Sequence, residues 1–222
     1  MLMGAAGVPT ELPEEITNVT SAISSADATS YTFSSVALGA ASATRAIYVF
    51  ITGQESTGQA PTITPVTVRG VTATKVTDVY NSTEPHYVSS LWKAAVPSGT
   101  SGDIAVTLNK TMSQLGVIVW ALTGDHYQFN LQTNTSSSTA SFSLTSVPDN
   151  SVILAGRGGH SSHTHTWSSA VDENIDQVIA DGVVQSGASK EHATGGDFTV
   201  TCTPSANAVR PRTFCLVLSP TQ

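Results

Sequence analysis

Charged residues are scarce in this sequence. Lysine, arginine, aspartate and glutamate make up 11% of its 222 residues, against roughly 25% in ordinary soluble domains. Serine and threonine take their place, which is unusual for a solitary soluble enzyme. Such a surface suits a protein whose faces are partly covered by neighbours, or a hardy extracellular particle. The nine basic residues are scattered and the formal net charge is −7, so we expect no nucleic-acid partner.

Cysteines and long apolar segments are also few. The two cysteines, Cys202 and Cys215, cannot form a disulfide framework. They either pair across a terminal hairpin or remain two buried thiols, and the second interpretation is the simpler one. The longest apolar run, "GVIVWAL", is far below the ~20 residues of a membrane span, so we expect no membrane partner. The start of the chain lacks a basic n-region, so we expect no export by the general secretory route.

A helical period is missing as well, since no window of a dozen residues after Ser30 shows apolar residues at helical spacing. Short runs of β-forming residues alternate instead with turns rich in glycine, proline, asparagine and serine. Examples are "AIYVFI" (46–51), "TITPVTVRGVTATKV" (62–76) with a hairpin turn at Arg69-Gly70, and "LGVIVWAL" (115–122). This pattern predicts an all-β fold, an antiparallel β-sandwich or jelly roll.

The two halves of the chain resemble each other. "GDIAVTL" (102–108) is followed by "GVIVWAL" (116–122), as "GDFTVTC" (196–202) is followed by "TFCLVLS" (213–219). We therefore expect a first sandwich half over 31–125, a linker over 126–138 and a second half over 139–222. Two arrangements fit, namely two tandem sandwiches, or one large jelly roll in which each half contributes to both sheets.

Several of these strands are apolar at every position, although a strand with one wet face should alternate. One face must meet the sandwich core. The other face also needs cover, either from the second half or from another subunit. This pattern favours assembly into a homo-oligomer.

The first thirty residues differ from the rest, with two prolines and weak periodicity. We interpret residues 1–30 as an N-terminal arm that clasps a neighbouring subunit, with a frayed terminus as the alternative. A short helix around "PEEITNVTSAI" is compatible with this segment. The residues expected to make the assembly contacts are Leu2, Met3, Val8 and Leu12.

Residues 31 to about 219 resemble the virion structural proteins of tailed bacteriophages and prophages. The resemblance rests on Arg45 before an apolar run, "VTVRGVTAT" (66–74), "WKAAVPSGT" (92–100), "VWALTG" (119–124) and the later "THTW" (164–167). It implies a β-sandwich particle component, such as a head decoration, spike, fibre or tail accessory, located in the virion. The implied partners are other copies of the chain and other capsid or tail proteins.

The stretch "HSSHTHTW" (160–167) is the candidate metal site. His163 and His165 should share one face of a strand, because side chains alternate with a period of two. His160 should lie in a loop before them. One chain thus offers two or three ligands, whereas a closed site needs about four to six. A threefold axis would supply six, as in the His-x-His pairs of phage tail fibres; the alternative, which we favour, is a set of exposed polar residues.

Other chemical signatures are missing or incomplete. "DENID" (172–176) has the spacing that opens a calcium loop, but Gln177 stands where glycine is needed and Val183 where the glutamate belongs. A solvated loop is the better interpretation. No nucleophile elbow, dinucleotide fingerprint or P-loop occurs. We therefore expect no catalytic residues, no enzymatic activity and no cofactor.

Carbohydrate binding is the main alternative function. Sandwich folds often bind sugars by stacking them on exposed aromatic rings. The candidate glycan contacts are Tyr80, Tyr87 and Tyr127, with His86 and Phe129 nearby in or close to loops. Trp92 and Trp120 lie inside strand patterns, where core packing is expected. The sequence thus predicts a non-enzymatic virion structural protein, or else an adhesin module for host surface glycans.

Overall fold

The fold consists entirely of β-strands and connections over the part of the chain that the computed structural model describes, residues 15–55, 61–79, 87–160 and 163–221. The first half contains β1 (Glu15–Ser24), β2 (Ala28–Ala37), β3 (Ala46–Glu55), β4 (Ile63–Val68), β5 (Val71–Thr72), β6 (Thr74–Asp78), β7 (Tyr87–Ala95) and β8 (Ser101–Thr123). The second half contains β9 (His126–Asn134), β10 (Ala140–Val147), β11 (Ser151–His160), β12 (His165–Trp167), β13 (Asp172–Ala180), β14 (Val183–His192), β15 (Gly196–Pro204) and β16 (Val209–Pro220). Among these residues no helix could span a membrane.

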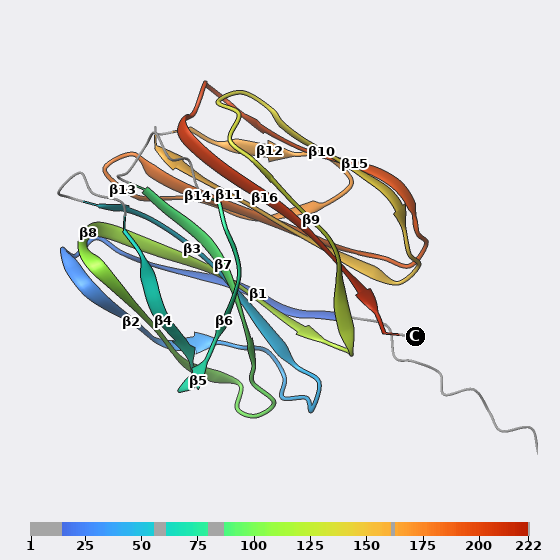
Figure 1. Ribbon diagram of the computed structural model, residues 1–222, viewed down its shortest axis with the longest axis horizontal. Coiled ribbons are helices and arrows are strands. Elements are labelled where there is room, and N and C mark those ends of the chain that lie inside the picture. Colours follow the sequence, from blue (N-terminus) through green and yellow to red (C-terminus); the bar gives the residue numbers. More distant parts are fainter. Residues whose placement is uncertain (1–14, 56–60, 80–86, 161–162, 222) are drawn as a thin grey trace, which may run out of the picture.

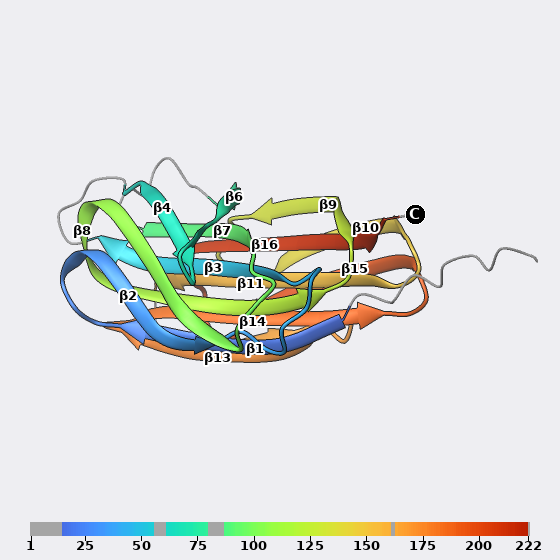
Figure 2. The same ribbon diagram turned by 90° about the horizontal axis from the view of Figure 1, so that it is seen from below.

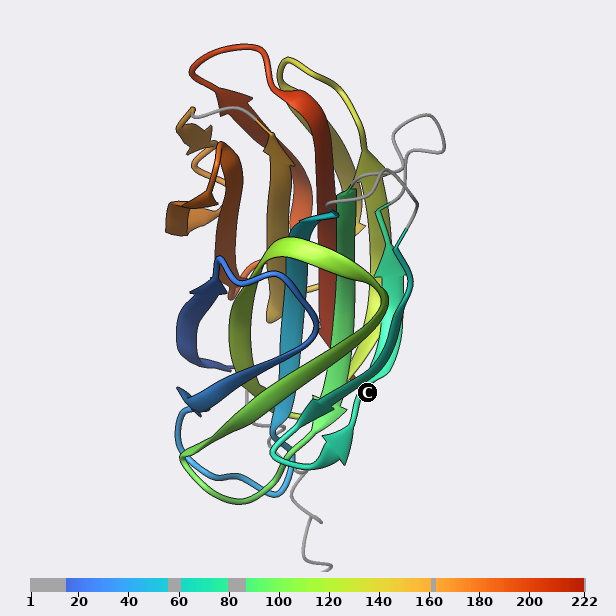
Figure 3. The same ribbon diagram turned by 90° about the vertical axis from the view of Figure 1, so that its left-hand side faces the viewer.

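The long strand β8 builds the first half into a sandwich. Its N-terminal part pairs with β2 and β4, and its C-terminal part, from Met112 on, pairs with β3 and β1. Because β8 bends between these parts (Figure 3), one strand contributes to both layers. The two strands that the sequence predicts over 104–108 and 115–122 are therefore segments of a single strand. Apolar side chains of both layers, among them Phe33, Val49 and Val106, form the core between them.

The second half repeats this plan with separate sheets. Its large sheet has the order β13-β14-β11-β16-β9, and its small sheet the order β10-β15-β12. In the first half, the layer that corresponds to this large sheet has the order β6-β7-β3-β8-β1, with the C-terminal part of β8, and we call it the large layer. Each half is thus a sandwich of its own, and of the two predicted arrangements the tandem one is observed. Cys202 and Cys215 are free, buried thiols in the small and the large sheet of the second core.

The two large layers pack against each other, face to face (Figure 1). Phe50 of β3 and Phe214 of β16 meet with their ring centroids 5.0 Å apart. Trp120 of β8 lies edge-on to Phe214 at 6.3 Å. Tyr48, Leu91 and Ile118 from the first half and Val152, Leu154 and Leu216 from the second complete this third core. The chain is therefore stacked in four layers. Figure 2 looks along this stack from below, so that the strands of the layers overlie one another.

This stacking covers the strands that are apolar on both faces. In "AIYVFI", Ile47, Val49 and Ile51 point into the first sandwich, whereas Tyr48 and Phe50 point at the second half. Of the two sources of cover considered for the outer face, the second half of the same chain is the one observed. The apolar pattern therefore gives no reason to expect a second copy of the chain.

The prediction of an N-terminal arm over residues 1–30 is wrong for the C-terminal part of that segment. Residues Glu15–Ser24 form β1, which pairs with β8 over its length, so that only the residues before Glu15 precede the fold. The short helix around "PEEITNVTSAI" is also wrong over these residues. Thr17, Val19 and Thr20 are β-branched and favour extended backbone, and β8 supplies the hydrogen-bond partners. The arm residues Leu2, Met3, Val8 and Leu12 lie outside the described residues.

The predicted linker over 126–138 is wrong in the same way. Residues His126–Asn134 form β9, which pairs with β16 at the edge of the large sheet. Phe129 packs against the second core and Leu131 against the core between the halves. Polar residues on this edge strand conceal its strand character in the sequence. Only the connection from Thr135 to Thr139 remains between the strands.

Two turn features match their sequence patterns. Arg69 and Gly70 both have positive φ, 51° and 77°, and join β4 to β5 as a two-residue hairpin turn. Arg45 is buried and ties two loops together. Its guanidinium donates to the carbonyls of Leu38, Gly39 and Ala40 before β3, and to those of Val96, Ser98 and Gly99 after β7.

Candidate functional site

A buried cluster of polar side chains lies inside the second sandwich. β12 contributes His165 and Trp167, the preceding loop contributes His163, and β13 contributes Asp176 from the opposite sheet. His165 is 4% and His163 7% exposed. The expectation that both histidines share a face is confirmed, but their expected exposure is wrong. The strand turns its alternate residues Thr164 and Thr166 outward instead.

Asp176 holds the His165 ring in one orientation. The backbone N–H of His165 donates to Asp176 Oδ2, and Nδ1 donates to Oδ1, both at 2.8 Å. Two contacts with one carboxylate leave the imidazole little freedom and make Nδ1 the protonated nitrogen when the ring is neutral. Its Nε2 then has a lone pair to offer. That atom lies 3.1 Å from Nε2 of His163.

The position of Asp176 corrects another expectation. "DENID" is the start of strand β13, neither a calcium loop nor a solvated loop. Asp176 is the register partner of Ser186 on β14, and the side chains of such a pair point to the same face of the sheet. Ser186 points into the sandwich, where it accepts a hydrogen bond from Trp167 Nε1 at 2.8 Å. Partial burial and the nearby Asp176 raise the pKa of Glu173. Within β13 it is therefore Asp176 that brings a carboxylate into contact with the cluster.

A buried arginine lies next in the same row of the sheet. Arg157 of β11 is the register partner of Ser186, and it is 0% exposed. Its guanidinium donates to the carbonyls of Ser136 and Ser138 at 3.1 Å and lies 3.5 Å from that of Cys202. Burial lowers the pKa of Arg157, because desolvation disfavours the charged form. Arg157 therefore ties the connection after β9 to the small sheet, as Arg45 ties loops in the first half.

His160 does not join the other two histidines. It ends β11 instead of lying in a loop, and its ring lies edge-on to Tyr87 with centroids 5.9 Å apart, beside Gly182. Within the described ranges, no three or more histidine, cysteine, aspartate or glutamate side chains converge closely enough to hold a metal. The three-histidine centre is therefore wrong. Sharing His163 and His165 across a threefold axis has no support either, because both side chains point into their own sandwich and not toward its outer face.

The cluster is poorly arranged for nucleophilic catalysis. In a Ser-His-Asp arrangement, the carboxylate orients the imidazole and the opposite nitrogen faces the nucleophile. Here Asp176 fulfils the first role, but Nε2 of His165 faces a second imidazole. The arrangement can relay a proton or chelate a cation. The expectation that the protein is not an enzyme stays a prediction.

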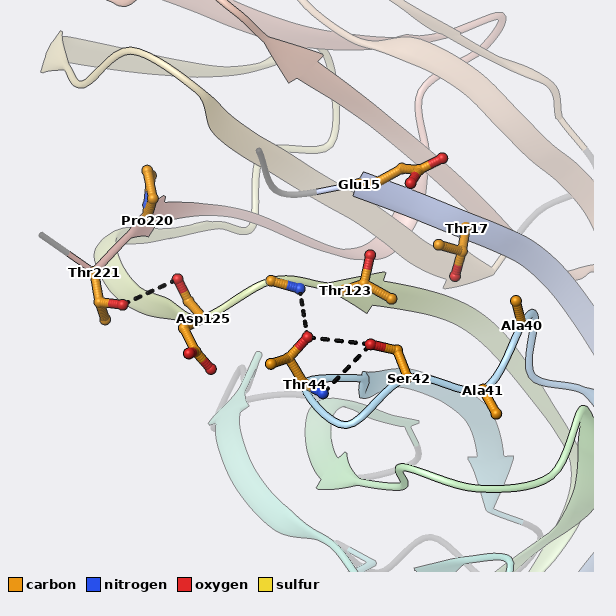
Figure 4. A pocket seen from close by; sticks show the side chains of 11 residues that line it. Glu15, Thr17, Ala40, Ala41, Ser42, Thr44, Thr123, Asp125, Pro220 and Thr221 are labelled. Carbon is orange, nitrogen blue, oxygen red and sulfur yellow. Dashed lines mark hydrogen bonds between the residues drawn. The ribbon is translucent and has the colours of Figure 1, made fainter. Parts of the chain in front are cut away.

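A separate cleft of about 540 Å³ lies where the ends of both halves meet (Figure 4). It is lined by residues of β1, the β2–β3 loop, the β8–β9 connection and the end of the chain. Thr44 Oγ1 accepts from the backbone N–H of Gly124 at 3.0 Å, and its hydroxyl lies 3.3 Å from that of Ser42. Glu15 and Asp125 are the carboxylates of the lining, which has no aromatic residue. The cleft was not evident from any sequence motif.

The predicted glycan contacts differ in how far their side chains are exposed. Tyr87 is 3% exposed, with Arg210 over its ring at 5.2 Å, so it cannot stack on a sugar and this prediction is wrong. Tyr127 is 43% exposed and remains a candidate. Tyr80 and His86 lie outside the described residues. Trp92 and Trp120 are core residues, as expected.

Comparisons with known proteins add little. No protein-family model and no curated protein matches the chain. Among solved structures, the chain is similar to PA5104 from Pseudomonas aeruginosa PAO1, a conserved protein of unknown function, with 15% sequence identity and a TM-score of 0.33. The match covers 90% of this chain and 79% of that chain. A similarity this distant supports no statement about function.

Proposed function

We propose that the chain is a non-enzymatic structural component of a phage-like virion, packing against symmetry mates and the particle shell or tail. The resemblance on which this rests involves residues that serve the architecture. Arg45 ties loops together, "VTVRGVTAT" carries the β4–β5 hairpin, and Trp92 and Trp120 are core residues. These motifs belong to a rigid body, with no reacting group among them.

The composition of the outermost faces is the observation that carries this proposal. On β10 every exposed position is a serine or threonine, and on β15 two of the four exposed positions are threonines. They include Ser141, Ser143, Thr199 and Thr203, and β2 continues the pattern in the first half with Thr29, Ser30, Thr32 and Ser34. Both outer sheets thus present broad surfaces of low charge, on which Asp103 of β8 and Asp197 of β15 are exposed carboxylates. Such faces can pack against a neighbour without the cost of desolvating charges.

Contacts between subunits would then use these hydroxyl faces and the strand edges, since the apolar faces are buried within the chain. Polar contacts of this kind are individually weak. A symmetric particle compensates by repeating them many times. We therefore propose self-association within a particle, with other virion proteins as partners, while the isolated chain stays monomeric.

Mass spectrometry of purified particles, with imaging to locate the chain, tests this proposal. A lysine at Thr199 and one at Ser143 should lower incorporation several-fold without changing the fold, because each places an unpaired charge in the contact. Lysine at exposed Ala206, in the connection between β15 and β16, is the matched control. Deleting residues 1–14 tests the arm contacts separately. Absence of the chain from every particle would refute the proposal.

Glycan binding is the second candidate, and the cleft near Thr44 and Asp125 is the observation that favours it. Its volume lies within the ~300–1,000 Å³ of small-molecule sites, and hydroxyl and carboxylate groups are suited to sugar hydroxyls. A glycan array should then give hits that are lost in Asp125→Ala. A Tyr127→Ala variant separates this cleft from the exposed ring, and an array without hits rejects the second candidate.

A further inference from the structure

The geometry points to a binding site for one divalent transition-metal ion, such as Zn²⁺, between His163 and His165, with Asp176 as the residue that positions His165. The two Nε2 atoms lie 3.1 Å apart. An ion bonded to both at about 2.0–2.1 Å would subtend an angle of about 98°, within the range of tetrahedral and octahedral coordination. The site is independent of the proposed function.

The ring positions are compatible with an ion shared by the two nitrogens. If the two nitrogens pointed straight at each other, the ring centroids would lie about 5.4 Å apart, since a ring nitrogen lies about 1.15 Å from its centroid and hydrogen bonds prefer linearity. The centroids are 4.7 Å apart. With both lone pairs directed at one ion, about 4.8 Å is expected at the bond lengths above. The observed separation agrees with two rings facing a common third atom, and it excludes only a linear hydrogen bond between them.

The surroundings of His165 match those of a metal ligand. Ligating histidines commonly donate their second ring nitrogen to a carboxylate, which fixes the ring and increases its basicity. Nδ1 of His165 makes this bond to Asp176 at 2.8 Å. The carboxylates of Asp176 and Glu173 are the negative groups on this side, and the nearest buried cation in the row is Arg157.

Two imidazoles alone make an incomplete site within the described residues, which contain no third ligand side chain at this point. His163 retains 7% exposure, so the pair is not fully sealed from solvent. Because the His165 side chain is 0% exposed, the remaining ligands of such an ion would have to be water molecules that reach it past His163. Such an ion would bridge the loop before β12 to β12 itself and brace the small sheet through Asp176 against β13.

Calorimetric titration of Zn²⁺ into the full, tag-free chain tests the site. We expect one ion per chain, with binding abolished in His163→Ala and in His165→Ala. Asp176→Asn should weaken binding 10–100-fold, as for a residue that positions a ligand. His192→Ala is the matched control and should bind as the original chain does, because its ring contacts Ala170 and Phe198 elsewhere.

Nitrogen NMR of the unmutated chain tests the site even if the alanine variants fail to fold. Zn²⁺ should shift the Nε2 resonances of two histidines and leave the Nδ1–H of His165 in place. Absence of stoichiometric binding, or binding that survives both alanine substitutions, would overturn the proposal. Shifts confined to other histidines would do the same, and the His163–His165 contact would then be a bent hydrogen bond.

Discussion

Phe50 and Phe214 lie in different halves of the chain, 164 positions apart by their numbers, yet their rings pack at 5.0 Å between centroids. Both are 0% exposed. Their contact lies in the middle of the core that joins the two sandwiches. The halves are therefore packed against each other through a shared core and not merely joined by the chain, although each has a core of its own.

Replacing Phe214 with alanine should remove much of this joining core. The ring contacts both Phe50 and Trp120, and a buried phenylalanine truncated to alanine costs about 3–5 kcal/mol. Denaturant unfolding should show this loss in a single transition. Ile23→Ala is the control, since Ile23 is 47% exposed and should change stability little. A loss below about 1 kcal/mol for Phe214→Ala would contradict the packing described.

Replacing Arg45 with methionine should destabilise the first half. Six backbone carbonyls accept hydrogen bonds from this guanidinium, and buried acceptors left without a donor cost about 1–3 kcal/mol each, less where water enters. We expect a loss of at least about 2 kcal/mol by urea unfolding. Lys75→Met removes an exposed cation and serves as the comparison. Equal stability of the two variants would refute the role assigned to Arg45.

His126 should make stability depend on pH. Burial, with Lys93 adding to the effect, lowers the pKa of His126 to about 4, while Nδ1 donates to Gly124 O and Nε2 accepts from the Tyr48 hydroxyl. An unfolded histidine has a pKa near 6.5. Between these values the unfolded chain binds a proton that the folded chain does not, so stability falls as the pH is lowered from about 6.5 to about 4.

A His126→Gln variant isolates this contribution. Its free energy of unfolding, measured in urea at several pH values, should fall less steeply through the same window. The carboxylates are shared by both proteins, so the difference between the two curves reports His126 alone. Parallel curves would show that the imidazole is not held neutral.

The two thiols should be unreactive in the folded protein. Burial raises the pKa of Cys202 to about 12 and also raises the pKa of Cys215, and the thiolate is the reactive form. An aromatic disulfide reagent at about pH 8 should label neither thiol in the native protein and both in denaturant. Rapid native labelling of Cys215 would mean that the second core opens readily.

Many of the strands were predictable because local patterns of neighbouring residues determine them. Alternating residues in "TASFSLTSV" and the continuous apolar run in "AIYVFI" match β10 and β3. Arg69-Gly70 is a turn pair in its own right. The edge strands β1 and β9 were not predicted, since both are rich in polar residues and their pairing with β8 and β16 is decided far away in the chain.

The candidate site was only half predictable. The His-x-His spacing places His163 and His165 on one face, but no spacing connects them to Asp176 on another strand, or separates them from His160. Exposure was also misjudged, because the face of β12 that turns inward depends on its pairing with β15. The cleft near Thr44 combines four separate segments and has no signature in any one of them.

By itself, then, the amino-acid order determined an all-β chain with a repeated pattern and strands too apolar to leave a face in water. Local periodicity and turn chemistry suffice for that. Only the tertiary structure decided that the second half covers the first and that Asp176 meets His165. Those outcomes depend on which layers bury the most apolar surface together, a free energy that belongs to the whole chain and to no single segment.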